Sequence, residues 1–516
     1  MPSRGNEHPP LARRWVDVTA MYEATWDSVR THTVPDWYED AKLGVFLHWG
    51  LYSVPGWAPQ VPDIQQLLVH RGPRTLLREN PYAEWYRNSM LIRGSPTQGH
   101  HRKVYGDDYP YDNFVRVFND ASARANLDGI AELCQAAGAR YAVLTTKHHE
   151  GFALWPTTVA HPVKGDYHSA RDLVGDLTTA VRARGMRMGL YYSGGYDWPY
   201  NGAVLKRAGH VVLAVPHDRR YAEFATAHVR ELIDLYRPSV LWNDIAWPAA
   251  GDLPELFAYY YNSVPDGVVN DRWTQAKVPR NFLADVLVMA GGDVLQALWR
   301  FIPERRKHLT FAPPPHYDFR TPEYAVLHTT SERKWELARG VGHSFGANRA
   351  ERPEDIIGET QLIQLFVDIV SKNGNLLIGV GPRPDGTVPE TQQAPLRALG
   401  RWLQVNGEAI YGSRPWVLAS TKTSEGAPVR FTRCDEAVYA HVFGEQTTRR
   451  VGLRAVDATR LRRVRLVGHD EPLEWAAENG ALSVTLPERM PVAAVTVLDL
   501  GEGIRARVGP PGDQRS

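Results

Sequence analysis

Polar side chains recur at the ends of short apolar segments that are predicted to be strands. They are three histidines, a tyrosine, an aspartate and an arginine: His48, His148, His149, Tyr192, Asp244 and Arg272. Tryptophans accompany them: Trp49, Trp57, Trp85, Trp155, Trp242 and Trp247. A sugar needs directional hydrogen bonds to its hydroxyls and flat apolar surface against its C–H faces. Polar groups among aromatic rings therefore predict a carbohydrate site.

Each of these residues also has a structural interpretation. A His or Tyr at the end of a strand can satisfy loop backbone groups, and for His48 and Tyr192 both interpretations stay open. Successive strand residues face opposite sides of a sheet, so one ring of the pair His148–His149 is expected to enter the site and the other to support it. Asp244 lies among aromatic residues, where an acid must be paired or functional.

Zinc is the alternative use of three histidines and an aspartate at one site. The chain contains no H-x-H, H-E-x-x-H or C-x-x-C sequence, and diverging rings at positions 148 and 149 could not share one ion. Nor does it contain a G-x-G-x-x-G or Walker-type phosphate loop. No metal and no other cofactor is expected.

Alternating strands and helices must position these residues. Predicted strands cover 42–49, 140–147, 186–193, 239–246, 267–273 and 375–381, and predicted helices cover 127–137, 172–184, 218–236 and 359–372. This order is typical of a parallel sheet, and the number of units favours an α/β fold of the (β/α) TIM-like barrel type over an open sheet. Active sites of such barrels lie at the carboxyl ends of the strands, where the polar residues fall.

The domain organisation follows from changes in this pattern. Residues 1–34 are an N-terminal extension, and 35–414 form the barrel with an insertion at 274–315, either a surface feature or a lid. From 415 to 503 the chain has short strands and little helical periodicity, which predicts an appended C-terminal antiparallel β-sandwich that either packs on the barrel or binds sugar. Residues 504–516 are expected to be a tail.

Composition narrows the class of protein further. The 516 residues carry 59 basic and 58 acidic side chains, a formal charge of +1, which disfavours nucleic acid and anionic membranes as partners. Two cysteines, Cys134 and Cys434, make no disulfide framework. The N-terminus does not read as a signal peptide and no apolar run approaches about 18 residues, so we expect a cytoplasmic protein without a membrane span.

Longer motifs point to a family. They include WYEDAKLGVFLHWGLYSVPGWAP (37–59), YAVLTTKHHEGFALWPT (141–157), RPSVLWNDIAWP (237–248), VVNDRW (268–273) and HYDFRTPEY (316–324). With others in the same order they cover most of residues 37–416, and the chain resembles the α-L-fucosidases of glycoside hydrolase family 29.

The resemblance implies a retaining exo-α-L-fucosidase that acts on a fucosylated oligosaccharide or glycoside through a covalent fucosyl-enzyme. It assigns the nucleophile to Asp244 and the acid/base to Glu323, with Glu84 as the rival acid/base. Fucose contacts carry over to His48, Glu84, Trp85, His148, His149, Tyr192 and Arg272, and the aromatic setting adds Trp242. An α-L-galactoside hydrolase and a non-catalytic fucose-binding protein on the same fold are the alternatives. A homo-oligomer is possible.

Overall fold

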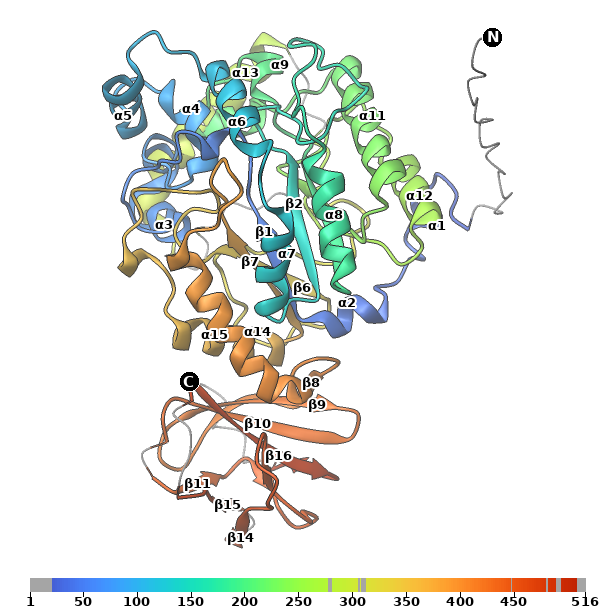
Figure 1. Cartoon of the computed structure of the whole chain (residues 1–516), viewed down its shortest axis with the longest axis vertical. Coiled ribbons are helices and arrows are strands. Elements are labelled where there is room, and N and C mark those ends of the chain that lie inside the picture. Colours follow the sequence, from blue (N-terminus) through green and yellow to red (C-terminus); the bar gives the residue numbers. More distant parts are fainter. Residues whose placement is uncertain are drawn as a thin grey trace, which may run out of the picture.

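A curled sheet lies at the centre of the larger domain (Figure 1). Its seven parallel strands follow the order β5-β4-β3-β2-β1-β7-β6. The computed structural model describes residues 21–276, 281–304, 307, 312–446, 448–478, 481–488 and 493–507. The strands are β1 (Leu43–Leu47), β2 (Tyr141–Lys147), β3 (Arg187–Ser193), β4 (Val240–Asp244), β5 (Val268–Val269), β6 (Trp335–Gly340) and β7 (Gly374–Val380). The predicted fold class, a TIM-like barrel with a C-terminal β-sandwich, is confirmed.

Residues 319–323 connect the two edges of this sheet. Isolated parallel bridges join Asn270 to Phe319 on the β5 side, and Arg320 to Trp335 and Glu323 to Ala338 on the β6 side. The segment therefore lies where a further barrel strand belongs, and Glu323 stands at its carboxyl end. The sequence pattern predicted neither this segment nor β6, and it extended β5 to residue 273.

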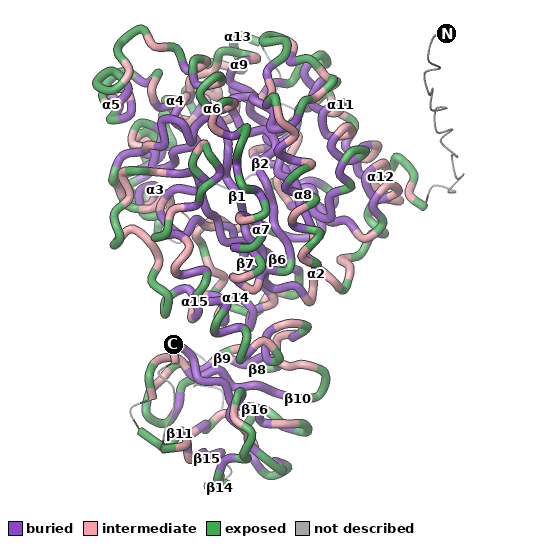
Figure 2. The backbone as a smooth tube through the Cα atoms, in the orientation of Figure 1, coloured by how far each residue is buried: buried purple, intermediate pink, exposed green. Residues whose placement is uncertain are grey.

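Helices cover the outside of the sheet, and Figure 2 shows the strands buried beneath them. Strands that are buried on both faces are mostly apolar. Side-chain caps fix several helix starts, as with Asp172 before α8 and Asp218 before α11. The helices are α1 (Trp26–Val29), α2 (Asp36–Ala41), α3 (Ile64–Arg78), α4 (Tyr86–Met90), α5 (Pro96–Tyr105), α6 (Phe114–Ser122), α7 (Leu127–Ala136), α8 (Leu173–Ala183), α9 (Trp198–Asn201), α10 (Ala208–Leu213), α11 (Arg219–Tyr236), α12 (Leu253–Ser263), α13 (Phe282–Leu298), α14 (Glu359–Ser371) and α15 (Glu390–Asn406).

A carboxyl group lies in the barrel interior. Glu336 on β6 is fully buried and accepts hydrogen bonds from the hydroxyls of Tyr38 (2.9 Å) and Tyr141 and from Trp242 Nε1 (3.1 Å). Burial raises the pKa of Glu336 to about 7, against the opposing effect of these donors. The barrel interior therefore consists of aromatic side chains around one carboxyl group, and this carboxyl group holds Trp242 directly below the candidate site.

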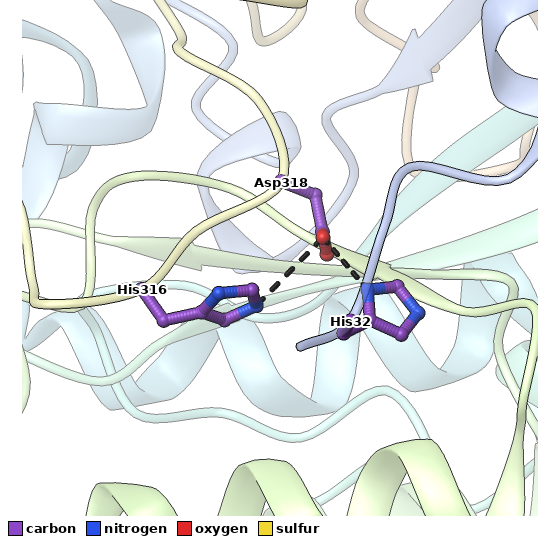
Figure 3. A group of neighbouring side chains, drawn as sticks. All are labelled: His32, His316 and Asp318. Atoms are coloured by element: carbon purple, nitrogen blue, oxygen red, sulfur yellow. Dashed lines mark hydrogen bonds and ion pairs between the residues drawn. The ribbon is translucent and has the colours of Figure 1, made fainter. Parts of the chain in front are cut away.

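A buried cluster ties the N-terminal segment to the start of 319–323 (Figure 3). Asp318 Oδ1 lies 2.9 Å from His32 Nδ1 and 3.7 Å from His316 Nε2, and Asp318 Oδ2 accepts from Tyr261 Oη (2.9 Å) and Val269 N (2.7 Å). The two imidazoles and the carboxylate offer ligand atoms within 4.8 Å of one another. Because these atoms already hydrogen-bond one another, Tyr261 and the backbone, we interpret the cluster as a structural clamp.

The C-terminal strands form three antiparallel sheets below α14 and α15 (Figure 1), with the orders β13-β16-β10-β9-β8, β11-β15-β14 and β12-β17. They are β8 (Arg414–Lys422), β9 (Pro428–Cys434), β10 (Ala437–Phe443), β11 (Arg450–Leu453), β12 (Val456–Asp457), β13 (Arg465–Leu466), β14 (Glu474–Glu478), β15 (Ala481–Thr485), β16 (Val495–Glu502) and β17 (Arg505–Ala506). The predicted tail 504–516 starts too early, because Arg505 and Ala506 pair with β12; residues 508–516 lie outside the described residues.

The insertion forms helix α13, and this helix changes one prediction. Phe282–Phe301 is long and apolar enough to cross a membrane by length and composition, and little of it is buried. The expectation of no membrane span relied on the absence of a long uninterrupted apolar run. Helix α13 meets the criteria of length and mean hydropathy although Asp285 and Asp293 interrupt its apolar residues.

The buried Glu336 predicts a pH-dependent contribution to stability. Its folded pKa of about 7 exceeds the roughly 4.3 of an unfolded Glu, so the contribution is complete below about pH 4.3 and is lost as pH rises through about 7. Glu336→Gln removes this titration. The unfolding free energy of the wild type minus that of the variant should therefore fall by up to about 3 kcal/mol between pH 4.5 and 8. Urea unfolding at both pH values measures this change, with the exposed Glu474→Gln as the matched control.

Candidate active site

Six of the predicted residues meet at the carboxyl ends of the barrel strands. His48 follows β1, His148 and His149 follow β2, Asp244 ends β4, Arg272 follows β5, and Glu323 ends the 319–323 segment. Parallel strands present their carboxyl ends at one face of a barrel, so residues from almost 280 positions of sequence, 48 to 323, come together there.

Arg272 binds both predicted catalytic carboxylates. Its Nη1 donates to Asp244 Oδ1 (2.9 Å) and its Nη2 to Glu323 Oε2 (3.1 Å). Its Nε donates to Thr321 Oγ1 (2.9 Å), and its guanidinium lies 4.7 Å above the centre of the Trp242 ring. Burial alone would lower the pKa of Arg272, but the two carboxylates raise it, so the side chain stays charged. One short planar cation therefore fixes how close the two acids lie.

Asp244 is buried and held from two sides. Besides Arg272, the hydroxyl of Tyr191 donates to Asp244 Oδ2 at 2.8 Å, and His149 Nε2 lies 3.7 Å from the same oxygen. The next two residues, Ile245 and Ala246, have φ values of 59° and 101°, which residues other than Gly rarely adopt. Backbone strain of this kind is typical of functional sites, where the surrounding structure enforces a geometry.

Glu323 is the more exposed acid. About 26% of its side-chain surface is accessible, compared with 11% for Asp244, and the Tyr82 hydroxyl donates to its Oε1. The following residue, Tyr324, also has a positive φ of 52°. Each predicted catalytic carboxylate is thus followed by a residue in the left-handed region, which aims the carboxylate while the chain turns away.

Glu84 has a different environment. It lies in a short 3-10 helix (Ala83–Trp85) and is almost fully buried. Its Oε2 accepts hydrogen bonds from Gly346 N (2.9 Å) and Ser344 Oγ (3.2 Å), and burial raises its pKa. These bonds hold Glu84 to the 344–346 loop.

Two of the histidines, His48 and His149, supply uncharged polar groups. Burial lowers the pKa of both His48 and His149 well below the usual value, so both imidazoles are neutral near pH 7. His149 Nδ1 hydrogen-bonds Ser193 Oγ (2.7 Å), whereas His48 Nδ1 is buried with no hydrogen-bond partner among the described residues. A neutral imidazole can donate and accept, as hydroxyl recognition requires.

The expectation that the rings of His148 and His149 diverge is wrong. Their centroids lie 3.9 Å apart. Strand β2 ends at Lys147, so both histidines belong to the following loop, where the alternation of strand side chains does not apply. The argument against a shared metal ion that relied on this divergence therefore fails.

The structure does not bring Tyr192 to this group. Its hydroxyl lies 3.3 Å from His228 Nδ1 and its ring stacks under Lys147 Nζ at 4.6 Å, in the layer between strands and helices. Tyr191 occupies the interior position instead. Sequence reasoning chose the wrong one of two adjacent tyrosines. The alternation of side chains along a strand could have identified Tyr191, because it pairs in register with Trp242, which lies two residues before Asp244 and on the same face of the sheet.

The two predicted tryptophans support the site at different depths. Trp242 is buried beneath the Arg272 guanidinium and stacks on Tyr191, with ring centroids 5.5 Å apart. Trp85 is partly exposed and meets His149 edge-on at 5.5 Å. Trp85 is therefore placed to meet a ligand, whereas Trp242 positions Arg272.

A buried ion-pair network fixes the histidine loop from below, and sequence reasoning missed it. Lys147 Nζ lies 3.1 Å from Asp197 Oδ2, and His161 Nε2 lies 3.0 Å from Asp197 Oδ1. Although burial opposes ionisation, these partners hold the pKa of Asp197 at about 2. The network ends next to Trp198, whose backbone N–H donates to the carbonyl of His149 at 2.8 Å.

Comparison with known proteins identifies the family. The family model described as alpha-L-fucosidase matches residues 12–408. The chain belongs to the α-L-fucosidase family of glycoside hydrolases. The tissue α-L-fucosidase of Bos taurus is 31% identical over 493 residues, with 92% of this chain and 89% of the relative covered; that of Rattus norvegicus is 30% identical over 491 residues, covering 91% and 89%.

Solved structures agree with this assignment. The α-fucosidase of Thermotoga maritima in complex with fucose is 37% identical and covers 93% of this chain and 99% of its own, with a TM-score of 0.76. An α-L-fucosynthase from the same organism gives 38% identity, the same coverage and a TM-score of 0.80. The resemblance drawn from the sequence motifs is confirmed, and so is the assignment to the glycoside hydrolases.

The two tyrosines of β3 offer a matched pair of variants. Tyr191→Phe removes a hydrogen bond to the Asp244 carboxylate, and bonds to charged groups contribute about 1.5–3 kcal/mol. We expect kcat/KM for p-nitrophenyl α-L-fucopyranoside to fall about ten- to a hundredfold. Tyr192→Phe removes only the contact with His228 and should change kcat/KM less than about threefold while lowering the unfolding free energy by about 1 kcal/mol. The reverse order of effects would contradict the assignment of Tyr191 to the site.

Proposed function

We propose that this chain is a retaining exo-α-L-fucosidase that releases terminal α-L-fucose through a covalent fucosyl-enzyme. In this mechanism Asp244 attacks the anomeric carbon while Glu323 protonates the leaving oxygen, and Glu323 then activates water. The observation that carries the proposal is the double contact of Arg272 with both carboxylates. Retaining glycosidases need their two carboxyl groups close together, about 5–5.5 Å apart, and the binding of both acids by one guanidinium supports such a spacing.

The surroundings of Asp244 favour the nucleophile role. Attack requires a carboxylate held at a fixed angle to the sugar, because a misplaced nucleophile loses much of the advantage of proximity. Tyr191 and Arg272 each hold one oxygen of Asp244, and the strained turn at Ile245 fixes the backbone behind it. His149 Nε2, beside the same carboxylate, is placed to donate to a sugar hydroxyl.

The surroundings of Glu323 favour the acid/base role over Glu84. An acid/base must meet the leaving group and then a water molecule, so it belongs on the solvent side of the sugar. Glu323 is about a quarter exposed, whereas Glu84 is 2% exposed and bound to Gly346 and Ser344. We assign Glu84, with His48, His148 and Trp85, to holding the fucose ring and its hydroxyls.

Chemical rescue tests the nucleophile. Asp244→Gly should lower kcat for p-nitrophenyl α-L-fucopyranoside by at least about a thousandfold, because the variant cannot form the fucosyl-enzyme. Azide then enters the space of the lost carboxylate, restores nitrophenol release and gives β-L-fucosyl azide. The wild type should release α-L-fucose as the first anomer seen by NMR, and activity should survive a chelator. First release of β-L-fucose would refute the retaining mechanism.

A second rescue separates Glu323 from Glu84. In Glu323→Ala the fucosyl-enzyme still forms from an activated aryl fucoside but reacts slowly with water, so azide should accelerate turnover and yield α-L-fucosyl azide. Glu84→Ala should weaken binding, raise KM and give no azide product. If azide instead rescues Glu84→Ala with the α-product, the acid/base is Glu84.

A further inference from the structure

Helix α13 carries an apolar surface that nothing in the described chain covers. Leu283, Leu287, Val294 and Leu298 are 67%, 62%, 57% and 51% exposed, and Val286 and Leu295 flank them. At 100° per residue these four side chains and the pair Ala290–Gly291 fall within one narrow stripe along the helix. Apolar surface of this extent is uncommon on monomers and marks an interaction site.

The opposite face of α13 is anchored to the barrel domain. Gly292 packs so closely on α10 that a Cβ there would lie 2.5 Å from Gly209 N, and Asp293 pairs with Arg207. Gln296 Oε1 accepts from Arg74 N (2.7 Å), and Trp299 Nε1 donates to Leu68 O (2.8 Å). The outward stripe is therefore presented on a fixed helix.

Gly291 has no role within the described chain. A Cβ at Gly291 would meet no atom within 4 Å, and its backbone is helical, so neither packing nor conformation calls for glycine. Glycine in an exposed helix costs about 1 kcal/mol relative to alanine. A glycine at position 291 is explained if another helix crosses α13 at Ala290–Gly291, because small residues there let the two helix backbones come close together.

The apolar positions are symmetric about that crossing point. Leu283 and Leu298 are equally distant from the midpoint between Ala290 and Gly291, and so are Leu287 and Val294, and Val286 and Leu295. A two-fold axis through the midpoint would place each residue against its counterpart on an antiparallel copy of the helix. An isologous interface requires such self-complementarity, and an unrelated partner does not.

We propose that two copies of this chain form a dimer through antiparallel pairing of their α13 helices at Ala290–Gly291. A formal charge of +1 on each chain gives little repulsion between copies. Helix α13 contains no Lys or Arg, which disfavours an anionic membrane as the occupant.

Sedimentation velocity of the full-length protein at micromolar concentration tests the dimer. The wild type should sediment with twice the 58.0 kDa mass of one chain. Leu287→Glu and Val294→Lys should each raise the dimer Kd at least about a hundredfold, because each buries unpaired charges. Leu235→Glu, at an exposed leucine on α11, should leave the dimer intact. All variants should keep the wild-type kcat on the aryl fucoside, which shows that they fold.

Mixing the two monomeric variants tests the antiparallel register. The glutamate introduced at position 287 of one chain then faces the lysine introduced at position 294 of the other, while the unchanged Val294 faces the unchanged Leu287. The mixture should therefore form a heterodimer although neither variant dimerises alone. Failure of the mixture to associate would overturn the antiparallel pairing. A monomeric wild type, a dimer insensitive to Leu287→Glu, or a monomer that binds neutral phosphatidylcholine vesicles through Leu287 would overturn the proposal.

Discussion

The active site depends on the placement of one guanidinium. Arg272 contacts Asp244, Glu323 and Thr321 with its three nitrogens and lies flat on Trp242. Without the guanidinium between them, the carboxylates of Asp244 and Glu323 would repel each other in this partly buried site. A lysine could neutralise them but could not define their mutual geometry, because its ammonium lacks the planar fork of donors. Charge balance and spacing therefore come from the same side chain.

Arg272 in turn depends on the barrel interior. Trp242, on which it lies, donates to Glu336, and Glu336 is held by Tyr38 before β1 and by Tyr141 at the start of β2. This chain of contacts runs from the amino end of the barrel to its carboxyl face through buried side chains. Because burial raises the pKa of Glu336 to about 7, ionisation at higher pH introduces a charge directly beneath the site.

The sequence predicted the strands and site residues that a local pattern identifies. It missed the residues whose positions depend on how the two edges of the sheet are joined. Apolar runs located β1 to β5 and β7, although β5 was drawn too long, and the polar residues after these strands gave His48, His149, Asp244 and Arg272. The 319–323 segment (FRTPE) was not predicted as a strand because it has no apolar run, yet the family motif still drew attention to Glu323. The choice between Tyr191 and Tyr192 required the register with β4. Glu336 stands in a segment with no apolar alternation, and only the closed barrel shows its partners.

Residues 274–315 join Arg272 to Glu323 along the chain, so a movement of the insertion could displace these two active-site residues. An outer helix that engages a partner would disturb the catalytic pair if the linkers transmitted its displacement. The return to the barrel is fixed, however, by Asp318, which binds His32, Tyr261 and the backbone of Val269 before Glu323 is reached. On the other side, Thr274 is held by its carbonyl, which accepts from Trp247 N at 2.8 Å. These two clamps separate the surface of α13 from the carboxylates, so the fold can use one insertion for association while Arg272 keeps the geometry of the site.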